Sequence, residues 1–86
     1  MPASPTLGGA LPDGALDERH PDTTQIARFF EYSHLTEELR PVSGDCAWLA
    51  AQMIQALPDG PELTAGLRKL LEAKDCFVRG ALREVD

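Results

Sequence analysis

Residues 57–61 read Leu-Pro-Asp-Gly-Pro, and they divide the second half of the chain into two helical segments. Two prolines and a glycine cannot continue a helix, because proline lacks a backbone N–H and its ring clashes with the preceding turn. Pro61 and Glu62 suit the first turn of a following helix, where proline loses no hydrogen bond and an acid meets the positive helix end. The stretch therefore predicts a tight connection between two helices that pack antiparallel.

Apolar residues recur at steps of three and four on both sides of this turn, which places each series on one face of a helix. The first series is Leu35, Leu39, Val42, Cys46, Leu49, Met53 and Leu57, with Trp48 beside it as a candidate interface residue. The second series is Leu63, Leu67, Leu70, Lys74, Phe77 and Ala81, flanked by Leu71, Val78, Leu82 and Val85. Pro41 predicts a kink or a restart of the first helix. The width of the second apolar face predicts contacts with both a hairpin partner and a second subunit.

A shorter helical pattern comes before the hairpin. Residues 22–24, Asp-Thr-Thr, can cap a helix in which Ile26, Phe29 and Phe30 share one face. Residues 1–21 show no helical period, so we expect a disordered N-terminal tail there and a helical-hairpin domain over residues 22–86. The predicted fold class is all-α: a short N-terminal helix plus an antiparallel two-helix hairpin.

The chain has 86 residues, which allows one small domain with a small core. Such a core usually needs a disulfide, a metal or self-association. Cys46 and Cys76 are better explained as two buried free thiols than as a disulfide across the hairpin. No CxxC or HxxxH spacing points to a metal site. We therefore expect a homo-oligomer in which the hairpins form a helical bundle.

The formal net charge of −6 argues against general binding to DNA or RNA, which requires many phosphates to be neutralised. Residues 63–83 differ from the rest, because five basic residues stand there against Glu72 and Asp75, a local charge of +3. This helix face either meets a small anionic ligand or is an ordinary solvated face. No apolar run reaches membrane-spanning length and no secretion signal is visible, so we expect a cytoplasmic protein that does not bind a membrane.

No enzyme signature stands out. The neighbours Ser33 and His34 do not form a catalytic pair by any known motif, and Gly8-Gly9 is not a phosphate loop because no strand pattern precedes it. We therefore expect neither catalysis nor a cofactor.

Two segments carry candidate binding residues. Lys74 replaces an apolar residue in its series, so its stem either packs while the amine reaches solvent or an acid, or the amine points into a pocket that holds an anion. Tyr32 and His34 break the apolar pattern and carry polar groups. A tyrosine ring can stack on a nucleobase.

Two blocks of the chain resemble a known family. The first is Phe30-x-Tyr32-x-His34-Leu35-x-x-x-Leu39-x-x-Val42-Ser43, and the second is the stretch LRKLLEAKDCFVR at residues 67–79. Together they are similar to small phage proteins that act as cyclic-nucleotide sponges against CBASS and Thoeris defence. The resemblance covers about residues 28–82.

The resemblance implies a hairpin protein that assembles from dimers into hexamers, works in the host cytoplasm and sequesters a cyclic nucleotide without cleaving it. Tyr32 matches the aromatic residue that stacks on a base, and Glu72-Ala73 match a shared step. Some sponges carry a lysine in the first long helix, where this chain reads Asp45-Cys46-Ala47-Trp48. Phosphate contacts would then come from the second helix. The candidate nucleotide-binding residues are Phe30, Tyr32, His34, Arg68, Lys69, Lys74 and Arg79.

Two hypotheses about function follow. The first is a sponge that binds cyclic dinucleotides or cyclic trinucleotides in pockets between protomers. The second is a helical adaptor that docks its apolar face on a host or phage protein and binds no small ligand.

Overall fold

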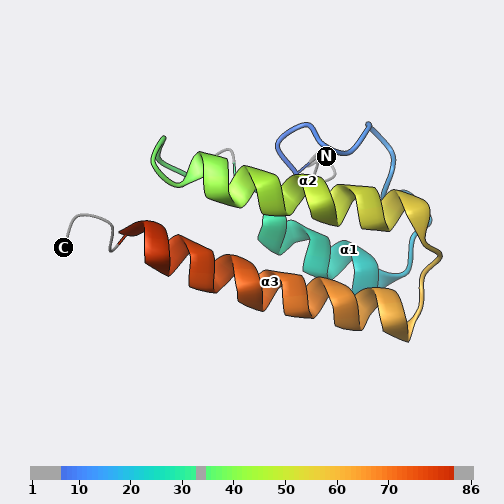
Figure 1. Ribbon diagram of the computed structural model, residues 1–86. Coiled ribbons are helices and arrows are strands. Elements are labelled where there is room, and N and C mark those ends of the chain that lie inside the picture. Colours follow the sequence, from blue (N-terminus) through green and yellow to red (C-terminus); the bar gives the residue numbers. More distant parts are fainter. Residues whose placement is uncertain (1–6, 33–34, 83–86) are drawn as a thin grey trace.

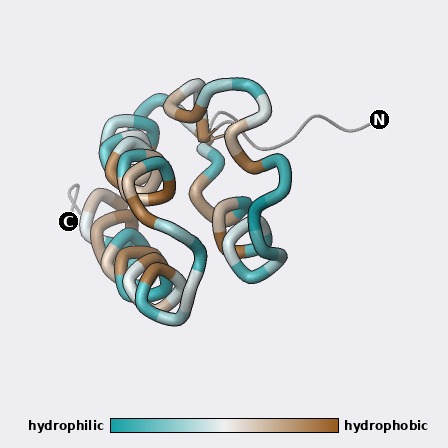
Figure 2. Tube along the Cα trace, turned by 90° about the vertical axis from the view of Figure 1, so that its right-hand side faces the viewer, coloured by the Kyte–Doolittle hydropathy of each residue, from teal (hydrophilic) through white to brown (hydrophobic). Residues whose placement is uncertain are grey.

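The computed structural model describes residues 7–32 and 35–82. Within these ranges the chain forms three α-helices and one 3₁₀ helix: α1 (Pro21–Ala27), η1 (Arg28–Phe30), α2 (Arg40–Ala56) and α3 (Pro61–Leu82). α2 and α3 run antiparallel, α1 lies against α3, and η1 contacts α2 (Figure 1). Viewed nearly along the helix axes, α2 and α3 form one layer, and α1 with the segment before it forms a second (Figure 2). The predicted all-α fold, a short helix followed by a helical hairpin, is confirmed.

The turn between α2 and α3 lies where the proline and glycine residues predict it. At the end of α2, Leu57 N donates a hydrogen bond to Met53 O at 3.0 Å. α3 then begins at Pro61, and both Thr64 N and Thr64 Oγ1 donate to Gly60 O at 3.1 Å.

The restart expected at Pro41 is the beginning of α2. Leu39 N and Arg40 N both donate to Thr36 O at 3.1 Å, so a single turn precedes the helix. Pro41 lies in the first turn of α2, where its missing N–H removes no helical hydrogen bond.

The buried face of α2 differs from the predicted apolar seam. Leu49, Met53 and Leu57 keep 41%, 37% and 45% of their surface exposed. Small side chains let neighbouring segments approach the α2 backbone closely, so the face of α2 with small side chains is covered. The leucine and methionine stripe lies at the edge of this covered face. The buried residues of α2 are Ser43, Cys46, Ala47, Ala50, Ala51 and Ile54.

Residues 7–20 differ from the predicted disordered tail. Leu7, Leu11 and Leu16 are 0%, 2% and 5% exposed and belong to the same core cluster as Phe30. We call residues 7–20 the N-terminal strap. Its leucines are separated by turns rather than by a helical period, which is why no periodic pattern announces their burial. The packed domain therefore extends at least from residue 7 to residue 82, and residues 1–6 lie outside the described residues.

Phe29 and Cys76 are exposed, although both are predicted to be buried. Phe29 is 63% exposed, whereas Ile26 and Phe30 are buried. The reason is that the 3₁₀ helix η1 follows α1. Successive residues of a 3₁₀ helix are rotated further around the helix axis than those of an α-helix, so Phe29 leaves the buried face. Cys46 is buried and Cys76 is exposed, and both thiols are free, so the prediction of two buried thiols is correct only for Cys46.

No helix within the described residues is both long enough and apolar enough to cross a lipid bilayer.

Candidate functional site

Phe30 belongs to the core. Its ring is fully buried among the strap and helix residues of the main cluster. A ring without exposed surface cannot stack on a nucleobase, so the assignment of Phe30 to a binding site is wrong for the single chain. His34, another predicted site residue, lies outside the described residues.

Tyr32 is half-buried and lies between the strap and α2. Its ring packs closely on Gly8, where a Cβ atom would overlap the ring, and a Cβ atom at Gly44 would lie 3.2 Å from it. Tyr32 lines an open hollow of about 580 Å³, together with Trp48 and Arg40. The hollow therefore offers two aromatic rings and one guanidinium group, although Glu37 and Asp45 also line it.

Lys74 binds the protein itself. Its Nζ donates a hydrogen bond to Phe29 O at 2.6 Å and lies 6.0 Å from the centre of the Phe30 ring. The amine thus satisfies a carbonyl of η1 and adds a cation–π contact. This placement explains a lysine in an apolar series: it joins α3 to η1 instead of pairing with an acid.

The other predicted basic residues do not converge on Tyr32. Arg68 lines a hollow of about 470 Å³ beside the N-termini of α1 and α3, whereas Tyr32 lines a different one. Lys69 and Arg79 are exposed, and Arg79 Nη2 lies 3.3 Å from Cys76 Sγ. Among the described residues, Arg68, Lys69 and Arg79 are therefore not brought to Tyr32, whereas Lys74 lies beside the buried Phe30 ring.

An apolar groove runs between α2 and α3. We call it the α2–α3 groove. Its volume is about 210 Å³, and Glu62 is the charged residue in its lining. Leu63 and Leu67 form its buried part, whereas the α2 side is half-exposed. The residues that line the groove are Leu49, Met53, Leu57, Glu62, Leu63, Gly66, Leu67 and Leu70. Such a lining is mostly apolar and offers few polar partners.

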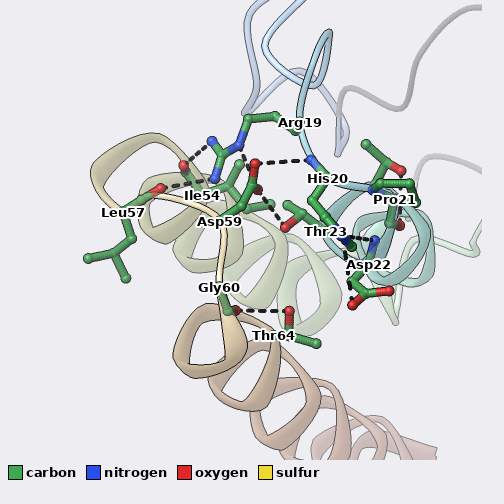
Figure 3. A network of polar contacts seen from close by, with 11 residues as sticks. Arg19, His20, Pro21, Asp22, Thr23, Ile54, Leu57, Asp59, Gly60 and Thr64 are labelled. Carbon is green, nitrogen blue, oxygen red and sulfur yellow. Dashed lines mark hydrogen bonds and ion pairs between the residues drawn. The ribbon is translucent and has the colours of Figure 1, made fainter.

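Arg19 joins the strap to the end of α2 (Figure 3). Its Nε donates to Asp59 Oδ1 at 2.9 Å, Nη1 donates to Ile54 O at 2.6 Å and Nη2 donates to Leu57 O at 2.9 Å. The guanidinium group therefore satisfies carbonyls at the end of α2 that have no helical partner. The sequence contains no signal for this role, because Arg19 stands in a segment without periodicity.

Asp59 is the acceptor at the centre of the same network. His20 N donates to its Oδ2 at 3.0 Å and Thr23 Oγ1 donates to its Oδ1 at 2.8 Å, in addition to Arg19. The hydrogen bond from His20 N, followed by the one from Thr23, lowers the pKa of Asp59 to about 2. The network fixes the turn between α2 and α3 to the strap and α1, which is a structural role.

No group of His, Cys, Asp and Glu side chains within residues 7–32 and 35–82 could hold a metal ion. Comparison with protein-family models, curated proteins and solved structures found no match for this chain.

Proposed function

We propose that the chain is a helical interaction module that binds an amphipathic helix of another protein in the α2–α3 groove. The observation that carries this proposal is the half-exposed leucine and methionine stripe along α2, beside the leucines of α3. Small soluble proteins seldom leave adjacent large apolar side chains in water unless a partner covers them.

The lining of the groove defines the partner. An amphipathic helix presents apolar residues at steps of three and four, which matches a shallow groove between two helices. Glu62 lines one end of the groove, so the partner helix should carry Lys or Arg at the position that faces it.

Site-specific photo-crosslinking tests this proposal. A photoreactive amino acid replaces Met53, which lines the groove, and in a matched control it replaces Gln55, whose amide donates to Ala51 O on the same helix. We expect position 53 to cross-link to an amphipathic helix with a basic residue near Glu62, and position 55 not to do so. A synthetic peptide of that helix should bind the chain. Met53→Glu should weaken the affinity for this peptide more than tenfold, because burying an unpaired charge costs about 2 kcal/mol or more.

Two results would contradict the interaction module. Equal cross-linking from positions 53 and 55 would show that the partner does not bind specifically in the groove. Cross-links only between copies of this chain would assign the groove to self-association.

A second candidate function is the cyclic-nucleotide sponge, and the hollow beside Tyr32 favours it. The rings of Tyr32 and Trp48 and the guanidinium group of Arg40 line this hollow, and its volume of about 580 Å³ suits a nucleotide. Under this proposal, homo-oligomers, with the hexamer implied by the resemblance, bring basic residues of a neighbouring protomer to the open side of the hollow. The ligand is sequestered without cleavage in the host cytoplasm.

Thermal unfolding with a panel of cyclic dinucleotides, cyclic trinucleotides and cyclic ADP-ribose tests the sponge. A ligand that binds only the folded chain raises the midpoint, by an amount that grows with its concentration. Trp48→Ala should remove this shift and leave the unliganded midpoint nearly unchanged, because Trp48 is 59% exposed. An oligomeric sample that shows no shift with any of these nucleotides would rule out the sponge.

A further inference from the structure

The hollow beside Tyr32 has two aromatic rings in its lining, and the two rings are placed differently. Trp48 lies on α2 and is 59% exposed, so its indole ring offers open surface. Tyr32 is half-buried, and its ring lies against Gly8 of the strap and Gly44 of α2. Trp48 is therefore the open aromatic surface of the hollow, and Tyr32 is a ring held in place beside it.

The charged groups of the same hollow are mainly acidic. The carboxylates of Glu37 and Asp45 line it together with the guanidinium group of Arg40. Arg40 Nε donates to Leu35 O at 2.8 Å, which holds this guanidinium group against the segment before α2. Two carboxylates and one guanidinium group leave a net charge of −1 in the lining, and the whole chain carries −6. The electrostatic potential at the hollow therefore favours a cation over an anion.

The remaining lining is uncharged and suits methyl groups. Ala10 and Pro41 contribute aliphatic carbon, and the hollow has a volume of about 580 Å³. The face of a tryptophan ring attracts cations more strongly than that of tyrosine or phenylalanine. A quaternary ammonium group combines a positive charge with methyl groups that pack on aromatic and aliphatic carbon. This lining matches both properties.

We propose that the hollow beside Tyr32 binds a small quaternary ammonium molecule. The Trp48 ring supplies the cation–π surface, and the carboxylates of Glu37 and Asp45 select positive charge. The site does not depend on the α2–α3 groove, because the two linings share no residue. A nucleotide would occupy the same hollow in the second candidate function, and the opposite charges of the two ligands separate these proposals.

Trp48 reports on its own site. It is the only tryptophan in the chain, so the fluorescence of the full-length protein comes from the hollow. The protein is titrated at constant ionic strength with tetramethylammonium and with choline, which keeps the screening of charges the same throughout. The control ligand is the uncharged isostere of choline, in which a carbon atom replaces the nitrogen. We expect a saturable change with both cations and about tenfold weaker binding of the isostere.

Two isosteric variants give a matched test of the carboxylates. Asp45→Asn removes a charge from the hollow, and Asp75→Asn removes one from an exposed position on α3 outside the hollow. Both variants change the net charge of the chain by the same amount. The affinity for tetramethylammonium should fall about threefold in Asp45→Asn, as expected for one exposed charge pair, and stay unchanged in Asp75→Asn.

Trp48→Leu tests the aromatic surface. Because Trp48 is largely exposed, circular dichroism should show unchanged helix content in this variant. Isothermal titration calorimetry replaces fluorescence as the readout here. It should detect binding of tetramethylammonium to the wild-type chain and none to Trp48→Leu.

Four results would overturn the cation site. The first is the absence of a saturable response to either cation, and a nucleotide that then changes the fluorescence of Trp48 would assign the hollow to the sponge. The second is equal binding of choline and its uncharged isostere, which would show that charge is not selected. The third is equal affinity in Asp45→Asn and Asp75→Asn. The fourth is undiminished binding to Trp48→Leu.

Discussion

Arg19 and Asp59 stand forty residues apart in the sequence and form an ion pair of 2.9 Å that joins the N-terminal strap to the turn of the helical hairpin. Arg19 at the same time binds two carbonyls at the end of α2. The pair therefore connects the strap, the turn between α2 and α3, and the end of α2.

Removing the charge of Asp59 should destabilise the fold. Asp59→Asn loses the ion pair with Arg19 and weakens the acceptor for His20 N and Thr23 Oγ1. We expect the midpoint of thermal unfolding to fall by several degrees. Asp13→Asn is the matched control, because Asp13 is exposed in the same strap. A midpoint that is equal in the two variants would contradict the structural role of Asp59.

The stability of the chain should fall in strong acid because of the same residue. The hydrogen bonds from His20 N and Thr23 lower the pKa of Asp59 from 3.8 to about 2. Since the folded form has the lower pKa, the stabilisation is fully present above about pH 4 and is lost as the pH falls towards 2. Urea unfolding between pH 2 and pH 5 measures this loss. In Asp59→Asn the same pH interval should show a smaller change, and an identical pH profile would assign the loss to other carboxyl groups.

Lys74 should contribute to stability through its bond to Phe29 O. Lys74→Met keeps the length of the side chain and removes the ammonium group, so the carbonyl loses its donor. We expect the free energy of unfolding to fall by about 1 kcal/mol, the usual loss for one hydrogen bond. Lys69→Met, an exposed position on the same helix, should change it by less than about 0.5 kcal/mol. If both variants unfold at the wild-type urea concentration, Lys74 does not hold α3 to η1.

The small side chains of α2 should not accept larger ones. Ala50 is fully buried, so Ala50→Leu forces neighbouring groups apart and should cost about 1–3 kcal/mol in the free energy of unfolding. Ala56→Leu, at the exposed end of the same helix, should have little effect. Urea unfolding of the two variants measures the difference. Equal stability would mean that the face of α2 with small residues is not the packed one.

Much of the secondary structure follows from local patterns. The prolines and glycine of residues 57–61 predict the turn, and the steps of three and four predict the two long helices. The α2 stripe shows the limit of this reasoning, because its periodicity identifies a helix but leaves open which face is covered. Leu49 and Met53 continue the period while being partly exposed, and Ala47 and Ala50 are buried because neighbouring segments approach small side chains closely.

The candidate sites were less accessible to prediction. Tyr32 lines a hollow, whereas Phe30 fills the core and Lys74 satisfies a carbonyl of η1. Whether a given apolar or basic side chain is buried depends on its contacts with distant segments of the chain. The spacing of residues in the sequence does not show these contacts.

The helices and their antiparallel connection can be predicted from local sequence, because they depend on backbone preferences and on periodicity. Three features come from tertiary packing instead: residues 7–20 pack as a strap, Arg19 meets Asp59, and leucines of α2 border an open groove. Each of these depends on the burial of side chains against segments far away in the chain, and burial is a property of the whole fold.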